Sequence, residues 1–480
     1  MPLIKVEGNK LAGFDEKKVN KDLFKNTGII AIGQLGAKAV SFLLLPIYTS
    51  YLTTVEYGTV DLLLTCSSVL TVFVGLQMNQ AVFRFLATAR NSDSEIRKIC
   101  SSSFFIFVIE IFVYSVLFII FSPLIRLDMK WFLYANVVMM CYLFLVSGIA
   151  RGFGHNLLYA CGNFISTITI LVISVLSLLF YNAGIKGILV SYVIGYFFGG
   201  SIILKKSDFL RKIRIVDIEK KQCIDILKYA VPLVPNELSW SVLHFSDRMI
   251  ISMFISLAAN GIIAVASKLS VIYTMIFSVF NASWTEQVFL IYKKEEGREY
   301  IAELLEQFFV FFGAVASLII SSMPLVFRLL ISEEYSSSYD LIPIYMIAVY
   351  FNVIIGGAGA IYLANHDTKI IAFTTCIAAL INLFVDFVLV KKVGIFAAPI
   401  SSICGYAVIA IWRIVDIDRR YFRFKICKKS IMKIVSLFLL SLFSYWSENY
   451  CIYFLILAIV LCLSYLMNRK FIKSIVYAIK

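Results

Sequence analysis

Apolar segments long enough to cross a membrane recur along the whole chain. The hydrocarbon core of a bilayer is about 30 Å thick, so a spanning helix needs about 20 mostly apolar residues. Windows of this kind fall at 27–48, 61–83, 100–121, 131–150, 157–180, 185–204, 233–256, 261–283, 305–328, 341–364, 370–390, 394–412, 431–446 and 450–467. The sequence therefore predicts an all-α polytopic membrane protein with about 14 transmembrane helices.

The composition agrees with this prediction. Of the 480 residues, 60% are hydrophobic and only 15% are charged, which is more apolar surface than a water-soluble core of this length can bury. The first 26 residues are polar, carry six lysines and lack the features of a cleavable signal peptide. The ten cysteines stand singly, without metal or redox spacing, so we expect them to be small packing residues.

Lysine and arginine are distributed unequally between the two sides of the predicted membrane. If the windows are threaded alternately from a cytoplasmic N-terminus, 34 of the 44 lysines and arginines lie inside and 5 lie outside. Because cytoplasmic loops carry an excess of these residues, we expect both termini to be cytoplasmic. The net charge of +14 then reflects stop-transfer signals and anionic-lipid contacts rather than a nucleic-acid surface.

The windows divide into two similar sets of six. YGTVDLLLTCS at 57–67 resembles NGIIAVASKLS at 260–270, at an offset of about 203, and a second pair of stretches matches at an offset of about 210. Internal duplication of this kind is common in transporters. We therefore expect a cytoplasmic segment at 1–26, an N-lobe at 27–204, a cytoplasmic linker at 205–228, a C-lobe at 229–415 and a C-terminal helix pair at 416–480.

The loops between the windows offer little room for a soluble domain. The longest predicted outer loop, around 328–340, has about a dozen residues. The longest inner connection is the linker, in which Phe209, Leu210, Ile213 and Val216 recur at helical spacing among basic residues. This pattern predicts an amphipathic helix that lies in the membrane interface.

Ionisable and amide side chains are concentrated in the first two windows of each half. An Arg or Asp at the centre of a membrane helix costs roughly 2.5 to 3.5 kcal/mol, so such residues normally face a bundle interior or a watery cavity. The candidate cavity cations are Lys38, Arg84, Arg248 and Lys268. The other candidate lining residues are Gln34, Gln77, Asn79, Gln80, His244 and Asn281, and the candidate acids for ion coupling are Asp61, Glu237 and Asp247.

A structural interpretation stays open for some of these residues. Asp247 lies about 100° around the helix from Arg248, so the two are poorly placed to pair with each other. Each is as well placed to pair with another helix as to face a cavity. Glu110 and Asp386 are lone acids in the third and eleventh windows, and we expect them to be structural partners or packing exceptions.

No pattern typical of an enzyme is present. The three histidines stand far apart, without HExxH or any other spacing of metal ligands. The chain has no GxSxG or Walker pattern and no soluble region that would hold a nucleotide. The sequence therefore predicts no catalytic residue, no metal and no cofactor.

Two stretches of the chain resemble a known family. KNTGIIAIGQLGAKAVSFLLLPIYTSYLTTVEYGTVDLLLTCSSVL at 25–70 looks like the opening of bacterial polysaccharide repeat-unit flippases of the Wzx type, in the superfamily that also holds MATE exporters and lipid II flippases. SDRMIISMFISLAANGIIAVASKLS at 246–270, followed by FNASWTEQVF, resembles the start of that family's second half. The likeness extends over roughly residues 20–415, but Trp284 is not followed by the family's usual proline.

The resemblance implies two pseudo-symmetric six-helix lobes around a central cavity that opens alternately to each side. It implies a polyprenyl-diphosphate-linked oligosaccharide as substrate, flipped from the cytoplasmic to the outer leaflet of a bacterial inner membrane for O-antigen lipopolysaccharide, capsule or exopolysaccharide. Cations would hold the diphosphate, and amides would contact the sugars. A polysaccharide polymerase and a chain-length regulator are the implied partners, and the cycle would run on the membrane potential or on proton or sodium coupling.

Three alternatives to this interpretation are open. A MATE-type drug exporter would need a negative or aromatic cavity, whereas the residues counted above are cationic. A lipid II flippase would differ only in the head group of its substrate. A membrane polysaccharide polymerase would need an outer loop large enough for catalytic residues, and no loop here has that length.

Overall fold

The structure, a computed structural model, describes residues 36, 39–40, 42–90, 92–124, 129–292 and 295–479. These residues form two compact units, which divide between Gly261 and Ile262. Gln34 and Lys38, two of the candidate site residues, lie outside the described residues.

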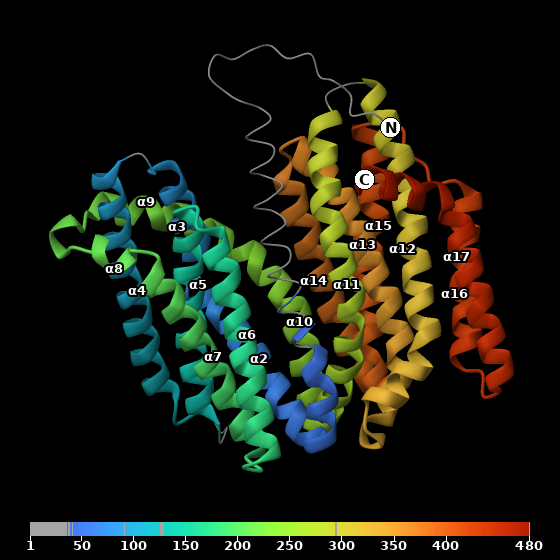
Figure 1. The fold of residues 1–480 in the computed structure, drawn as a ribbon, viewed down its shortest axis with the longest axis horizontal. Helices are drawn as coiled ribbons and strands as arrows, with labels where there is room; N and C mark the ends of the chain where they lie inside the picture. The colour runs from blue at the N-terminus through green and yellow to red at the C-terminus, as the bar shows by residue number, and fades with distance from the viewer. Residues whose placement is uncertain are drawn as a thin grey trace. The chain divides into compact units, whose positions relative to one another are not determined.

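The first unit consists of helices that are drawn from blue to green in Figure 1. A helical stretch, Phe42–Tyr51, precedes them. They are α2 (Thr54–Val74), α3 (Met78–Thr88), α4 (Asp93–Phe121), α5 (Lys130–Gly152), α6 (Asn156–Leu179), α7 (Gly184–Lys206), α8 (Phe209–Lys212), the 3-10 turn η1 (Ile215–Asp217), α9 (Lys220–Ala230), η2 (Val231–Leu233) and α10 (Val234–Phe254).

The second unit is drawn from yellow to red in Figure 1 and also consists of helices. Its first helix, α11 (Leu257–Ile291), begins in the first unit. The others are α12 (Glu295–Leu330), the 3-10 helix η3 (Glu333–Leu341), α13 (Ile342–Ala364), α14 (Thr368–Val393), η4 (Gly394–Phe396), α15 (Ala397–Arg420), α16 (Lys428–Tyr445) and α17 (Tyr450–Ile479). The last two pack on α12 through a cluster that includes Ala314, Leu437 and Val460.

The helices confirm the predicted fold class. Among the described residues, 10 helical stretches are long and apolar enough to cross a membrane, and one of them, Thr368–Arg420, contains both α14 and α15. The described residues contain no β-strand. The protein is therefore an all-α, multi-pass membrane protein. The residue after Trp284 is threonine, and α11 continues through this position without a break.

The second predicted segment, 61–83, differs from the prediction because it is interrupted. Its first helix, α2, starts with a capping box in which the Thr53 hydroxyl accepts from the Glu56 backbone NH, and the Thr53 NH donates to the Glu56 carboxylate at 2.9 Å. This helix ends at Gly75. Leu76 and Gln77 then take positive φ values of 40° and 59° before α3 begins. Residues other than glycine rarely adopt these φ angles. The residue types at 76 and 77 therefore do not indicate a break.

The linker also differs from the amphipathic helix that its spacing predicts. Only the four residues of α8 are helical in the predicted stretch, and α9 follows after η1. Figure 1 shows α8 and α9 beside the N-terminal end of α4, and both contact α4. Phe209 and Ile226 are buried in a core with residues of α3 and α4. We call residues 207–230 the linker strap.

A buried arginine connects three helices of the second unit. Arg413 of α15 is 2% exposed. Its Nη1 donates to the Ile355 carbonyl of α13, and its Nη2 donates to the Thr374 hydroxyl of α14, both at 3.0 Å. One turn further along α15, Asp416 accepts from the Tyr362 hydroxyl at 3.0 Å. The planar guanidinium presents its donors in a rigid fork that reaches acceptors on two helices at once, whereas a lysine has only one nitrogen from which to donate.

Arg413→Lys is expected to destabilise the protein, because one ammonium group cannot reach both acceptors. Loss of a hydrogen bond from a charged donor costs about 1.5 to 3 kcal/mol, so the midpoint of thermal unfolding in detergent is expected to fall by several degrees. The matched control is Arg423→Lys, at an exposed position just after the same helix. Equal midpoints for the two variants would contradict this assignment.

Candidate functional site

The charged centre of the first unit is an ion pair between α2 and α10. Arg248 Nε lies 2.8 Å from Asp61 Oδ2, and the two side chains are only 12% and 10% exposed. Asp61 lies seven residues into α2, which places it about 11 Å along that helix from Thr54. Breaking a buried pair leaves an uncompensated charge and costs about 3 to 5 kcal/mol. The pair therefore holds α2 and α10 together in this conformation.

A close crossing of helices lies one turn from this pair. At Gly58 of α2, a Cβ atom would lie 1.9 Å from the Leu257 carbonyl oxygen, and at Gly261 of α11 it would lie 2.1 Å from the Thr54 carbonyl oxygen. The buried Asn260 side chain donates to the Gly58 carbonyl at 2.8 Å. The two stretches that resemble each other in sequence thus touch at their equivalent glycines. Only residues without a side chain permit this approach.

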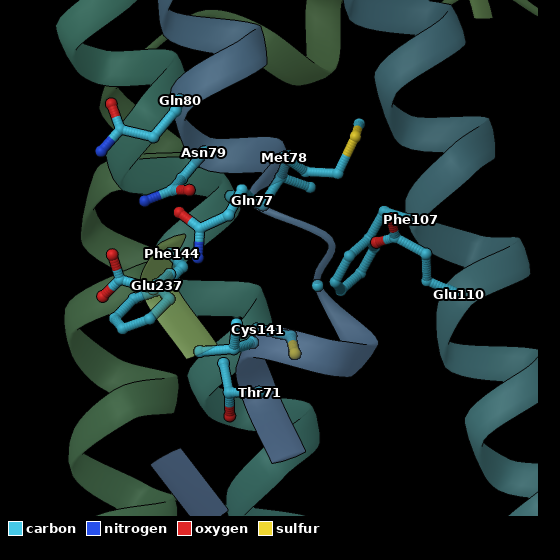
Figure 2. Close-up of a pocket in the computed structure, with 13 residues that line it drawn as sticks. Thr71, Gln77, Met78, Asn79, Gln80, Phe107, Glu110, Cys141, Phe144 and Glu237 are labelled. Atoms are coloured by element: carbon cyan, nitrogen blue, oxygen red, sulfur yellow. The ribbon is translucent and has the colours of Figure 1, made fainter. Parts of the chain in front are cut away.

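A polar cavity of about 190 Å³ opens at the break between α2 and α3. Three of its lining residues, Gln77, Asn79 and Gln80, come from the break and the start of α3, and Glu237 comes from α10. Figure 2 shows Glu237 beside Phe144 and below Asn79. The cavity has room for several water molecules. Four residues that the sequence suggested for a polar lining or for ion coupling therefore lie around one cavity.

Glu110 of α4 lies on the other side of the same cavity. Its side chain points toward the break between α2 and α3 in Figure 2. The residue is 9% exposed, and its Oε1 atom has no hydrogen-bond partner among the described residues. Glu110 is 17 residues along α4, which places it about 26 Å from the start of that helix. A carboxyl group at this depth normally marks a functional site.

The remaining candidate residues are spread over both units. In the first unit, the Arg84 guanidinium lies 4.3 Å from the centre of the Tyr229 ring, and Asp247 is buried. His244 lies in α10, but its side chain is outside the described part of the structure. Lys268 and Asn281 lie on α11 in the second unit and are both partly buried. The structure brings Asp61 and Arg248 together, and it gathers Gln77, Asn79, Gln80 and Glu237 at the cavity.

The position of Glu110 was missed because nothing in its own helix marks it. It is the lone acid in an apolar segment, so a structural partner or packing exception was the expected interpretation. The signal that could have found it is the cluster of amides at 77–80, which is too polar for a continuous lipid-facing helix. Such a cluster requires a polar counterpart on a neighbouring helix.

The fold and the charged interior define a multi-pass membrane protein whose first unit encloses ionisable groups. The profile of the polysaccharide biosynthesis protein family matches residues 23–285. This match covers more than half of the chain, so the chain belongs to that family. No curated protein matches the chain in sequence.

Solved membrane transport proteins share this fold. The structure of the lipid II flippase MurJ in an inward closed conformation is 14% identical, with a TM-score of 0.72 over 93% of this chain and 99% of the other. An inward-facing MATE family multidrug resistance transporter of the MOP superfamily is 13% identical, with a TM-score of 0.68 over 84% and 95%. An outward-facing MATE structure gives 0.56 at 14% identity over 86% and 96%.

Gly58→Ala is expected to disrupt the crossing of α2 with the start of α11. The added methyl group meets backbone atoms rather than a flexible side chain, so the cost is expected to reach the upper end of the usual 1 to 3 kcal/mol for overpacking, about 3 kcal/mol. Thermal unfolding in detergent measures it. Gly313→Ala is the control, because its Cβ would meet the movable Ile434 side chain at 3.2 Å. A Gly58→Ala midpoint no lower than that of the control would refute this account.

Proposed function

We propose that the protein is a flippase that moves polyprenyl-diphosphate-linked oligosaccharide repeat units from the cytoplasmic to the outer leaflet for surface polysaccharide assembly. The observation that carries the proposal is the buried Arg248–Asp61 pair, 2.8 Å apart, inside a membrane protein of the polysaccharide biosynthesis family. A diphosphate head group cannot enter hydrocarbon unaided, whereas its polyprenyl tail remains there. A cation inside the bundle gives the head group a favourable site.

Arg248 would act as a diphosphate ligand whose charge is held by Asp61 until the substrate arrives. An arginine guanidinium binds phosphate oxygens with paired, charge-assisted hydrogen bonds. The diphosphate would therefore compete with Asp61 for Arg248. Neutralisation of Asp61, by a proton or by another cation, would favour this exchange. The ion pair would then open and re-form during transport instead of staying closed throughout.

The other candidate residues complete this proposal. Lys38, Arg84 and Lys268 would supply further positive charge for the diphosphate. Gln77, Asn79 and Gln80 would contact sugar hydroxyls at the cavity, where aromatic Phe144 also lies. Gln34, His244 and Asn281 are proposed for the same polar lining.

Ion coupling is proposed for carboxyl groups of the first unit. The sequence suggested Asp61, Glu237 and Asp247, and the cavity adds Glu110 as a fourth candidate. Moving about two negative charges outward across an inside-negative potential of 100 mV is favourable by up to about 5 kcal/mol, because one full charge gains about 2.3 kcal/mol. Either the potential or the coupled entry of protons or sodium would thus drive export. The protein would act as a transporter and not as an enzyme.

The proposed setting is a bacterial inner membrane with both termini in the cytoplasm. The excess of lysine and arginine in alternate loops supports this orientation. Glycosyltransferases would supply the lipid-linked substrate on the inside. A polymerase and a chain-length regulator would consume it outside, for O-antigen, capsule or exopolysaccharide.

A drug exporter or lipid II flippase is the second candidate, and two observations favour it. The match with the MurJ structure extends over 99% of the MurJ chain at a TM-score of 0.72, and the two glutamates at the cavity would also suit a cationic drug. Loss of surface glycan in a strain without the protein distinguishes repeat-unit flipping from these alternatives. Loss of drug tolerance or of cell-wall synthesis would support the second candidate instead.

Neutral variants of the ion pair separate its structural role from its proposed role in transport. Asp61→Asn and Arg248→Gln alone are each expected to lower stability by about 3 to 5 kcal/mol, because each removes one half of a buried ion pair and keeps the other charge in place. The double variant removes both charges and is expected to recover most of that stability. Surface glycan, measured by immunoblotting, is expected to stay at least tenfold reduced in the double variant because Arg248 is missing.

The control for the double variant is an exposed ion pair of the same unit. Lys98 Nζ lies 3.1 Å from Glu219 Oε2, with side chains 39% and 44% exposed. Exposed pairs contribute about 0 to 1 kcal/mol, so Lys98→Gln with Glu219→Gln is expected to leave glycan export unchanged. Normal export by the stable Asp61→Asn and Arg248→Gln double variant would refute a transport role for Arg248.

Glu110→Gln tests whether the acid at the cavity takes part in coupling. The amide keeps the shape of the side chain but cannot carry charge. We expect glycan export to fall at least fivefold, with normal protein levels in the membrane, when the sodium or proton gradient is the only driving force. Glu299→Gln, at an exposed position of α12, controls for a general effect of losing one carboxylate. Unchanged export by Glu110→Gln would show that Glu110 is only a packing exception.

A further inference from the structure

The linker strap carries an exposed apolar tip. Ile215 is 85% exposed and Val216 is 94% exposed, and Leu210 nearby is 56% exposed. The rest of the strap is well packed, because Phe209, Ile226 and Ala230 are each 1% exposed or less. The exposure of the tip is therefore a local feature and not a sign of poor packing. We call Ile215 and Val216 the apolar tip.

Contacts with α4 fix the position of the tip. Its neighbours on either side are tied to consecutive serines, because the Arg214 backbone NH donates to the Ser101 hydroxyl at 2.9 Å and the Glu219 NH donates to the Ser102 hydroxyl at 3.4 Å. The Asp217 Oδ2 atom also lies 3.5 Å from Nε of Arg97 on α4. The strap thus has a defined register along α4.

This register places the tip at the boundary between head groups and hydrocarbon. Ser101 is eight residues after the start of α4, or about 12 Å along the helix. The last charge before the apolar run of α4 is Lys98, and exposed side chains from Phe104 onward are apolar. Since α4 has 29 residues and a span needs about 20, its hydrocarbon part begins close to the serines that hold the tip.

Basic residues flank the tip along the chain, and one of them, Arg211, also pairs with Asp208 at 3.0 Å. Arg211 has a side chain that is 84% exposed, and Arg214, Lys220 and Lys221 are also exposed. Exposed cations beside exposed aliphatic side chains are the two features that attract a segment to an anionic bilayer surface. A soluble protein partner would not explain why the tip sits at this depth.

We propose that the apolar tip inserts into the inner leaflet of the membrane, with Arg211 and Arg214 bound to the phosphates of anionic phospholipids. The linker strap is then a lipid anchor that connects α7 to α10 while it stays fixed to the start of α4. The anchor would hold the strap in place whichever substrate the protein transports.

Photo-crosslinking of the full-length protein in lipid nanodiscs tests the proposal. Benzoylphenylalanine at position 216 is expected to form adducts with phospholipid, detected by mass spectrometry. Position 112, where the native Phe112 is 66% exposed on the apolar part of α4, is the positive control. Position 94, exposed in the first turn of α4 and about 10 Å from Ser101 on the side away from the hydrocarbon, is the negative control. Position 215 repeats the test if the variant at 216 accumulates poorly.

The lipid composition separates the two parts of the proposal. Adducts at 216 are expected to be at least threefold more abundant in phosphatidylglycerol than in phosphatidylcholine nanodiscs, and Arg211→Gln with Arg214→Gln is expected to remove this preference. Equal yields in the two lipids would overturn the role of the arginines. Absence of lipid adducts at 215 and 216, or adducts with protein alone, while position 112 labels lipid, would overturn insertion of the tip.

Discussion

The contact on which the first unit most depends is the ion pair of Asp61 with Arg248. Each charge alone would be costly inside a membrane, and pairing offsets part of that cost for both. The pair joins α2, near the start of the chain, to α10, which follows the linker strap. Because it lies one turn from the glycine crossing, α2 is held there by both an electrostatic contact and a steric one. Any event that neutralises Asp61 would loosen this arrangement.

The break between α2 and α3 follows the C-terminal end of α2, beyond the ion pair. It gives the unit its polar interior. A continuous helix satisfies its own backbone groups, whereas a broken one exposes carbonyl and amide groups that need polar surroundings. The amides at 77–80, Glu110 and Glu237 supply those surroundings. The ion pair and the cavity both involve α2 and α10, so a change at one can reach the other through two helices.

Much of the architecture could be predicted from the sequence, because membrane helices are marked by long apolar runs. The concentration of polar residues around 77–80 and 237–248 was equally visible. The break at Leu76 and Gln77 was not visible, since those residue types do not favour positive φ. Arg413 shows the same limit, because only tertiary contacts reveal that it joins three helices. The partner of Arg248 depended on packing between distant helices, which spacing within one helix cannot give.

The most direct test of the account uses vesicles that contain the purified protein and a lipid-linked oligosaccharide. The rate at which the sugar becomes accessible to an external lectin is measured for a polyprenyl diphosphate carrier and for a neutral polyprenyl glycoside with the same sugar. The protein is expected to accelerate movement of the diphosphate-linked lipid at least tenfold over protein-free vesicles and to leave the neutral lipid unaffected. Equal rates for the two lipids, or no acceleration of either, would contradict the claim that the buried arginine serves an anionic head group.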